Sequence, residues 1–553
     1  MRYNVGNKRK NSKNYLVQGT ILTVAAIVAK VIGMIYRIPL TNILGDDGIG
    51  YYSTANEIYN ILLMISTFSL PLALSRLVSE RRHLGQAKNA HKVFVCAMKF
   101  AVAAGAVMAL LTFFLAGVIT DNIMHVGSAA LALRVLAPAI FLFAIAGAFR
   151  GFFQGHETMV PTATSQVIEQ IVNAVISVVG AGVMMGIGTK MAEKSGDPNL
   201  GPAWGAAGGT FGTVASISVA LLFLVVVYIS YQRTFKRHLR KDPAKHLESD
   251  QAIYRALLVT IGPIVLSTLV YNIGTLIDQG IFNSVLASQG YSEKQYSTIW
   301  GIYSGKYRVL MNVPLCVASC LSPSVVPALT AAMADGNHKE AGIKVRDSIR
   351  YTMIITIPCA VGMAALASPI MQLIFGDAKS LTAGIMQQGA LLIVLLALST
   401  LSTGILQGLG EMKKPLYNTT FALVVQIVTL YLFLRVFRLN IYSVIYSNTI
   451  FALIICVLNA IAIGQKISYR QEIKKTFLIP LISSGVMGLA AIGIYQLFHL
   501  FAGNAISCIL AVLVAMAVYG VLLVKLGGIS EKELLGIPKG TLIVQILKKC
   551  RLL

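Results

Sequence analysis

The chain has 553 residues, of which 56% are hydrophobic and 12% are charged, and its mean hydropathy is +0.73. Soluble globular proteins carry about 25% charged residues, so this composition excludes a water-soluble globule. The net charge of +24 would suit a nucleic-acid partner in a soluble protein, but in so apolar a chain it is typical of basic loops that anchor membrane helices, and we expect no nucleic-acid partner.

Apolar segments recur along the whole chain. A helix needs about 20 mainly apolar residues to cross a bilayer, and open strand edges are not tolerated in lipid. The first apolar run is too long for a cleaved signal peptide. The sequence therefore predicts an all-α integral membrane protein with about 14 transmembrane helices. In chain order, the predicted helices are residues 15–38, 57–79, 93–118, 129–149, 160–185, 204–231, 253–283, 298–331, 349–372, 382–407, 415–434, 441–464, 476–498 and 503–524.

Lysine and arginine collect in every second connecting segment. With the N-terminus in the cytoplasm, 32 of the 46 basic residues lie in cytoplasmic segments and 6 in external loops. Arg150 is the one cation of its cytoplasmic connection, and the first external loop, 39–56, carries Asp46 and Asp47 but no cation. The positive-inside rule predicts a multi-pass protein of the cytoplasmic membrane with both termini in the cytoplasm.

Two short segments are similar to each other: 150–161 (RGFFQGHETMVP) and 403–415 (TGILQGLGEMKKP). Six predicted helices separate them, and an even number preserves direction, so the repeat is parallel. It predicts two six-helix lobes and two additional helices. The predicted boundaries are 1–231 for the N-lobe, 232–250 for a basic cytoplasmic linker, 251–465 for the C-lobe, 466–525 for helices 13 and 14, and 526–553 for a cytoplasmic tail. The linker is either an amphipathic surface helix or a plain basic connection.

Several basic residues lie within predicted helices, where each costs about 2.5–3.5 kcal/mol on insertion and usually marks a pathway or a site. Lys30 and Arg37 are seven residues apart, so they fall on nearly the same helix face. Lys306 and Arg308 lie close together in an apolar helix and indicate a hydrated cavity. Arg76 is either a site residue or the end of its helix. A cavity lined with such cations favours phosphate or pyrophosphate.

Acidic residues are fewer in the predicted helices. Glu57, Glu169 and Asp278 are each candidates to pair with a cation and neutralise it. Asp278 is the best candidate for coupling to an ion, and Asn418 and Thr419 offer further oxygen ligands for a hard cation. The alternative for all three is hydrogen bonding between helices.

The sequence contains neither a Gly-x-x-x-x-Gly-Lys-Ser/Thr phosphate loop nor a His-Glu-x-x-His motif. Its seven cysteines are scattered, without the spacing of metal ligands, and are expected to be reduced packing residues. We therefore expect a transporter and not an enzyme, with no catalytic residue, metal site or cofactor. The expected energy source is an ion gradient, the membrane potential or metabolism that removes the product.

Four stretches carry a family resemblance: AKVIGMIYRIPLTNILGDDGIGYYSTANEIYNILLMIST, LPLALSRLVSER, GKYRVLMNVP and ILQGLGEMKKP. Together they resemble the polysaccharide-biosynthesis, MurJ-like branch of the multidrug/oligosaccharidyl-lipid/polysaccharide (MOP) exporter superfamily, in particular its Gram-positive lipid II flippases and their sporulation relatives. The resemblance covers nearly the whole chain. It implies two six-helix lobes in a V around a central cavity, and two further helices whose groove takes a lipid tail.

Members of this branch move undecaprenyl-pyrophosphate glycans from the inner to the outer leaflet by alternating access, using cations on the first, second and eighth helices. By motif, Lys30 and Arg37 match the first helix and Lys306 the eighth, whereas Arg76 sits later in the motif than the family's second-helix cation. This chain also has Lys where the Gram-negative members have Arg.

The resemblance thus implies a lipid II flippase that binds the diphosphate through Lys30, Arg37, Arg76 and Lys306. Arg308 is a further substrate-binding candidate because of its position beside Lys306 in an apolar helix. Its implied partners are lipid II, membrane lipids and cell-wall synthesis proteins. The family's sodium sites use the seventh and eleventh helices, which makes Asp278 and Asn418 the matching candidates. The alternatives are a flippase for another lipid-linked glycan (capsule, exopolysaccharide or spore cortex), a cation-coupled multidrug exporter, and a non-transporting scaffold.

Overall fold

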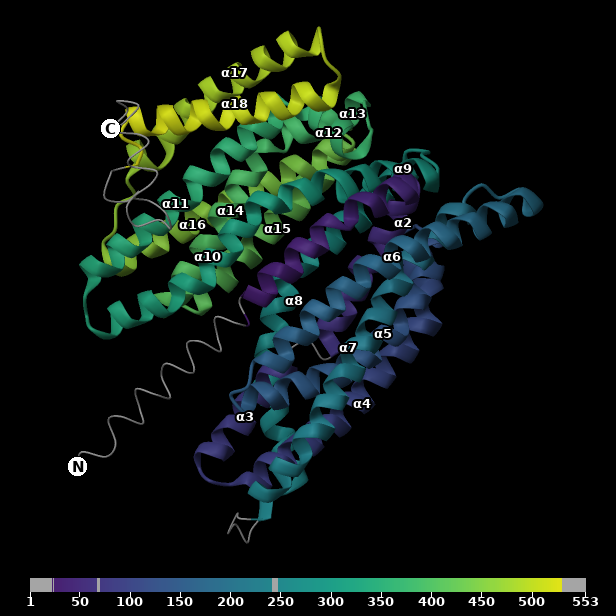
Figure 1. The fold of residues 1–553 in the computed structure, drawn as a ribbon, viewed down its shortest axis with the longest axis vertical. Helices are drawn as coiled ribbons and strands as arrows, with labels where there is room; N and C mark the ends of the chain where they lie inside the picture. Colours follow the sequence, from purple (N-terminus) through teal and green to yellow (C-terminus); the bar gives the residue numbers. More distant parts are fainter. Residues whose placement is uncertain (1–21, 23, 67–69, 241–246, 530–553) are drawn as a thin grey trace. The chain divides into compact units, whose positions relative to one another are not determined.

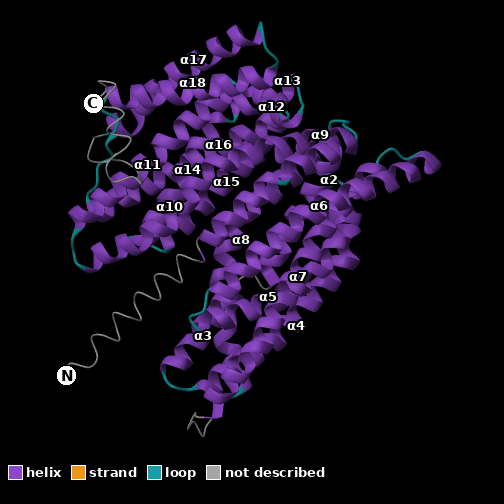
Figure 2. Ribbon diagram, viewed as in Figure 1, coloured by secondary structure: helices purple, strands orange, loops and turns teal. Residues whose placement is uncertain are grey.

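The computed structural model describes residues 22, 24–66, 70–240 and 247–529. Within these ranges all regular structure is helical and the connections are short (Figure 2). These residues include 12 helices that are long and apolar enough to cross a membrane, which confirms the predicted all-α membrane fold. The helix count of fourteen and the cytoplasmic termini stay predictions, because the beginning of the first predicted helix and most of the predicted tail lie outside the described residues.

The chain forms two compact units, Met1–Gly305 and Lys306–Leu553. After a short helix over Val24–Ile35, the helices of the first unit are α2 (Arg37–Ser66), α3 (Leu70–His83), α4 (Ala87–Val118), α5 (Ala130–Gly155), α6 (Val160–Ser195), α7 (Leu200–Arg240), α8 (Asp250–Ser288) and α9 (Glu293–Gly301) (Figure 1). Those of the second unit are α10 (Arg308–Ala334), α11 (His338–Ala365), α12 (Ala367–Phe375), α13 (Ser380–Gln388), α14 (Ala390–Gly408), α15 (Lys413–Arg435), α16 (Ile441–Ile467), α17 (Ile479–His499) and α18 (Asn504–Lys525). A π-helical segment, η3 (Ile302–Tyr307), spans the boundary between the units.

The predicted linker 232–250 does not coincide with this boundary. α7 continues to Arg240, residues 241–246 lie outside the described part, and α8 packs against α2, α3 and α4 of the first unit. The division into two functional lobes around this linker therefore stays a prediction.

Residues 39–56, predicted to be an external loop, do not form a loop: this segment is helical apart from Gly45, and its external position stays a prediction. The φ of 70° and ψ of 178° at Gly45 are open to glycine and strained for other residues. Leu40 and Tyr52 both lie close to Gly209, since a Cβ built there would be 3.4 Å from Leu40 and 3.3 Å from Tyr52. In a straight helix, two residues twelve positions apart would be separated by ~18 Å. The chain therefore folds back at Gly45.

A very close helix crossing holds the second half of α2 against α9. A Cβ on Gly50 would overlap the carbonyl of Ser297, and a Cβ on Gly301 would overlap the carbonyl of Asp46. Glycine is required at both positions because the two backbones touch.

The core of the first unit is built around α5, which packs against α2, α3, α4 and α7. Four aromatic rings meet there, with neighbouring centroids 4.5–5.8 Å apart: Phe94, Phe149, Phe152 and Tyr228. Such aromatic clusters contribute both buried apolar area and specific edge-to-face contacts.

Arg150 does not lie in a cytoplasmic connection, as the charge pattern predicts, but inside α5. It is 5% exposed, and its Nη2 donates to Oε2 of Glu169 at 2.6 Å while its Nε donates to Oγ of Ser165 at 3.0 Å. The expectation that Glu169 neutralises a cation is thus confirmed. A positive-inside count cannot distinguish a buried, paired arginine from a loop arginine.

In the second unit, α10, α11, α14 and α16 share one core, which includes Leu329, Val345, Met353, Leu401 and Ile463. The hairpin of α17 and α18 packs against α11 and α12, and Figure 1 shows its two helices side by side. Each copy of the predicted repeat forms the same local structure: a helix ends at Gly155 or Gly408, four residues turn, and the next helix begins.

Candidate functional site

Three predicted site cations belong to the first unit. Lys30 and Arg76 are exposed and Arg37 is half-buried. The bonds from Tyr36 N to Ile32 O and from Leu40 N to Tyr36 O carry the helical pattern through the segment between Lys30 and Arg37. Among the residues that the structure describes, none of the three cations has a carboxylate partner.

Lys306, in the second unit, has the opposite environment. Its Nζ lies 2.5 Å from Oδ2 of Asp377, and both side chains are more than nine-tenths buried. The same carboxylate accepts hydrogen bonds from the Thr382 hydroxyl at 2.8 Å and from the Lys379 backbone N–H at 2.9 Å. The sequence analysis missed Asp377, although it is the one carboxylate in its short predicted external loop.

Electrostatics at this pair favour the charged carboxylate. Burial alone would raise the pKa of the Asp377 carboxyl, but the hydrogen bonds from Lys306, Lys379 and Thr382 outweigh burial and hold its pKa below the ordinary value. Next to it, Arg308 begins α10 and is half-buried, and the Tyr307 hydroxyl donates to the carbonyl of Gly389 at 2.8 Å. Lys306 is thus a buried, paired cation in a rigid setting.

Asp278, the predicted ion-coupling residue, is 3% exposed on α8 in the first unit. The side-chain amide of its neighbour Gln279 makes three hydrogen bonds. Its Nε2 donates to Oε2 of Glu57 at 3.1 Å, and its Oε1 accepts from Thr54 Oγ1 at 2.5 Å and from Trp300 Nε1 at 3.1 Å. Sequence reasoning missed Gln279, which joins α2, α8 and α9 through these bonds.

The other two ion-coupling candidates lie on α15 in the second unit. Nδ2 of Asn418 donates to Oδ1 of Asn459 at 2.9 Å, and Thr419 is 3% exposed. Nδ2 of Asn459 donates in turn to the hydroxyls of Ser402 at 2.9 Å and Thr403 at 3.2 Å. This network links α14, α15 and α16.

The eight predicted site residues therefore divide between the two units. Lys30, Arg37, Arg76 and Asp278 belong to the first, and Lys306, Arg308, Asn418 and Thr419 belong to the second. Within the described ranges, no three His, Cys, Asp or Glu side chains lie close enough together to hold a metal ion.

Comparisons with known proteins agree with this architecture. The chain matches the family described as "Polysaccharide biosynthesis protein" over residues 16–333 and the family described as "MatE" over residues 302–432. It is 23% identical to the "Lipid II flippase MurJ" of Bacillus subtilis (strain 168) over 501 residues, which cover 86% of this chain and 87% of the relative. It is also 22% identical to the "Stage V sporulation protein B" of the same organism over 536 residues, 97% and 100% of the two chains.

Solved structures share the fold. A structure of lipid II flippase MurJ in an inward closed conformation matches with a TM-score of 0.61 and 16% identity, over 91% of this chain and 98% of that one. An inward-facing multidrug resistance MATE transporter of the MOP superfamily matches with a TM-score of 0.64 and 16% identity, over 79% of this chain and 95% of that one. These relatives are membrane transporters and flippases. The chain is a multi-pass membrane protein that belongs to the family described as "Polysaccharide biosynthesis protein".

Proposed function

We propose that this protein is a flippase that moves lipid II, the undecaprenyl-pyrophosphate-linked peptidoglycan precursor, from the inner to the outer leaflet by alternating access. The observation that carries the proposal is a set of three cations on apolar helices of the first unit for which the described part of the chain provides no carboxylate partner: Lys30, Arg37 and Arg76. An unpaired cation is tolerated at membrane depth where water or an anionic ligand meets it. A pyrophosphate supplies such a ligand, with several oxygens that accept charge-assisted hydrogen bonds.

The MurJ relative supports lipid II as the substrate, since it matches over most of both chains. The sporulation relative matches over an even larger share and favours a second candidate, a flippase for a spore-cortex or other lipid-linked glycan precursor. The MATE-like fold is also compatible with drug export, but a pump for cationic drugs is expected to line its path with carboxylates rather than with unpaired cations.

Lys306 takes part in this proposal in a specific way. Its ammonium is bonded to Asp377 inside the second unit, so it meets a diphosphate only in a state in which that ion pair opens. Arg308, half-buried at the start of α10, is the other proposed diphosphate ligand of the second unit.

The experiment that tests the proposal is leaflet translocation in proteoliposomes that contain the full chain. Labelled lipid II is compared with undecaprenyl-pyrophosphate carrying an unrelated glycan. Movement of lipid II alone supports the peptidoglycan flippase. Movement of the other glycan, alone or together with lipid II, favours a broader glycan exporter, and movement of neither contradicts both.

We propose in addition that transport is coupled to sodium or to the membrane potential through Asp278, a nearly fully buried carboxylate. The same assay, run with a sodium gradient, with a potassium gradient and with a potential alone, identifies the energy source. Asp278→Asn keeps the shape of the side chain and removes its charge, so we expect it to abolish the dependence on the gradient. Unchanged dependence in this variant would contradict the role of Asp278.

A further inference from the structure

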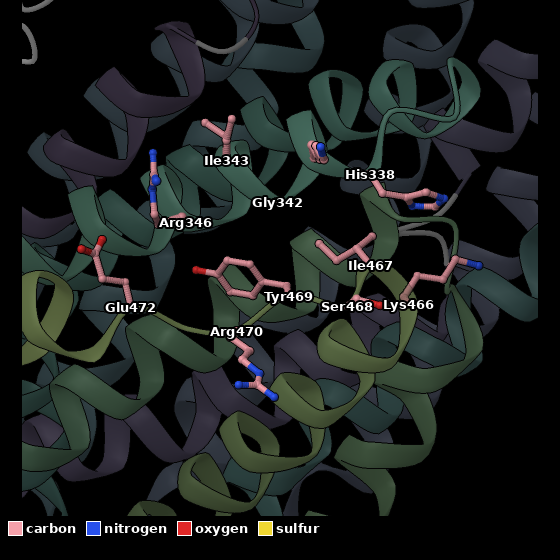
Figure 3. Close-up of a pocket in the computed structure, with 11 residues that line it drawn as sticks. His338, Gly342, Ile343, Arg346, Lys466, Ile467, Ser468, Tyr469, Arg470 and Glu472 are labelled. Atoms are coloured by element: carbon pink, nitrogen blue, oxygen red, sulfur yellow. The ribbon is translucent and has the colours of Figure 1, made fainter.

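A surface pocket of about 780 Å³ lies within the second unit, between the first turns of α11 and the segment that follows α16. Figure 3 shows the ring of Tyr469 in the middle of the pocket, with Arg346 and Glu472 toward one side and His338 and Lys466 toward the other. Both wall segments belong to connections that the charge pattern predicts to be cytoplasmic. None of the eight predicted site residues lines the pocket.

The lining is strongly basic. It contains one carboxylate, from Glu472, and four basic side chains, from Lys339, Arg346, Lys466 and Arg470. Lys339 and Arg470 are exposed, and neither has a carboxylate partner in the described part of the chain. Two cations without carboxylate partners in the described part of the chain generate a local positive potential at the pocket, which attracts anions.

The other two cations are only partly neutralised. Lys466 Nζ lies 2.9 Å from Oε1 of Glu411 in a surface pair whose side chains are 35% and 24% exposed, and solvent screens such pairs strongly. Arg346 bonds to Asp347, its neighbour in the chain, at 3.0 Å. An arriving phosphate therefore competes with weak partners, and Arg346 retains further N–H donors.

Polar and apolar groups complete the pocket. Gly342, Ile343 and Ile467 supply uncharged wall, and the Tyr469 hydroxyl donates to Oε1 of Gln471 at 3.1 Å. Burial raises the pKa of Tyr469 to about 12, so its hydroxyl stays protonated near neutral pH and adds no negative charge.

The residues that follow the pocket segment in the chain combine basic and apolar side chains. Exposed Lys474 and Lys475 and exposed apolar Ile473 and Leu478 follow the pocket segment and lead into α17. Basic residues beside lipid-facing apolar residues are typical of the level of the lipid headgroups. An anion in the pocket can therefore be part of a lipid or of a soluble molecule.

We propose that this pocket binds a phosphate group of an anionic ligand at the membrane surface, with Lys339 and Arg470 as its principal ligands. The pocket volume accommodates a phosphodiester or phosphomonoester headgroup with its substituent, and its donors match phosphate oxygens. The site lies inside one unit, so its failure would leave the proposed flippase function untouched.

The test uses the purified full chain in detergent and follows thermal unfolding by circular dichroism. Phosphatidylglycerol, phosphatidylcholine and inorganic phosphate are titrated separately at constant ionic strength. A ligand that binds only the folded state raises Tm in a saturable way. A response to phosphatidylglycerol but not to inorganic phosphate identifies a lipid headgroup as the source, and a response to inorganic phosphate identifies the phosphate group itself as sufficient.

The matched variants are Lys339→Gln/Arg470→Gln, which removes two pocket cations, and Lys474→Gln/Lys475→Gln, which removes the same charge just outside the pocket. We expect the first to weaken the apparent affinity by about tenfold or more and the second to leave it nearly unchanged. Gly342→Leu fills the pocket without a change of charge and is expected to abolish binding. Gly342→Ala is its control, because a Cβ there lies 3.7 Å from the Tyr469 ring, an ordinary contact.

Two results would overturn the proposal. One is the absence of any saturable response to either anion in wild type. The other is an equal loss of affinity in both double variants together with full binding by Gly342→Leu, since that pattern describes general attraction to a basic surface. Circular dichroism and size exclusion confirm that each variant is folded before its titration is compared.

Discussion

Lys306 and Asp377 form an ion pair in the interior of the second unit, with 2.5 Å between Nζ and Oδ2 and with side chains that are 7% and 6% exposed. The two residues are 71 positions apart in the chain. Their pairing fastens the π-helical segment η3 to the turn between α12 and α13. Because both charges are removed from water, each depends on the other for compensation.

Asp377→Asn should therefore destabilise the protein by about 3–5 kcal/mol, since it leaves the Lys306 ammonium buried without its counter-charge. Thermal unfolding of the purified variant checks this. Asp347→Asn, the same substitution in the exposed pair with Arg346, is the matched control and should cost at most about 1 kcal/mol. The double variant Lys306→Met/Asp377→Leu should recover much of the loss. Wild-type stability of Asp377→Asn would refute the account.

The stability that the Lys306–Asp377 pair contributes should depend on pH. The pKa of Asp377 is lower in the folded chain than its ordinary value, so the pair contributes its stability above the unfolded pKa of about 3.9. This contribution is lost as pH falls through the lowered folded pKa. The difference in Tm between wild type and Lys306→Met/Asp377→Leu should be constant from pH 7 to about 5 and should change steadily below about pH 4. A difference that does not vary with pH would count against the titration of Asp377.

Arg37→Ala should abolish or strongly reduce lipid II translocation while the protein remains folded, because no carboxylate of the described residues pairs with this guanidinium and we propose that it binds the diphosphate. Arg37→Lys keeps the charge but loses the bidentate geometry, so we expect partial activity. Initial translocation rates in proteoliposomes, normalised to the amount of inserted protein, provide the measurement. If well-folded Arg37→Ala transports at the wild-type rate, Arg37 does not bind the substrate.

Gly301→Ala should destabilise the first unit severely, because its Cβ would overlap the Asp46 carbonyl across the crossing of α2 and α9. Backbone atoms on both sides leave no flexible group to move aside. Gly493→Ala on α17 is the control, since a Cβ there meets nothing within 4 Å. Yield of folded protein and Tm report the effect. Equal behaviour of the two variants would show that the crossing is looser than described.

Asn459→Ala should lower stability more than Asn418→Ala. The Asn459 side chain makes three hydrogen bonds among α14, α15 and α16, whereas the amide of Asn418 makes one of these three. Each buried polar group that loses its partner costs about 1–3 kcal/mol. Thermal unfolding ranks the two variants. If sodium raises the Tm of wild type but not of Asn418→Ala, the network also takes part in ion binding.

Hydropathy predicted the membrane helices well because each must present an apolar surface to lipid along its own length. Side chains such as Val175, Val179 and Leu489 remain more than half exposed and apolar, and this property is visible in any local window of sequence. The segment 39–56 escaped prediction because its helix depends on contacts with distant glycines. Gly209 and Gly301 allow the polar stretch around Asp46 and Asp47 to pack closely, and no local window contains them.

The site residues illustrate the same limit. The sequence identified Lys306 as an unusual cation in an apolar helix, but not that Asp377 neutralises it, because the two are distant in the chain. Within the described ranges, neither Lys30 nor Arg37 has a carboxylate partner, so each remains an unusual charge on an apolar helix. Sequence therefore predicts which charges are unusual, and tertiary contacts decide which of them remain free to bind a ligand.

The hairpin at Gly45 has a practical consequence for mapping how the chain is threaded through the bilayer. With a single non-helical residue between its two helical segments, this turn offers no room for an inserted epitope, protease site or reporter domain. A tag placed there would disrupt the protein and give a false reading of its sidedness. The connection Gly196–Asn199 between α6 and α7, whose residues Gly196, Asp197 and Pro198 are exposed, is the better insertion point for such an experiment.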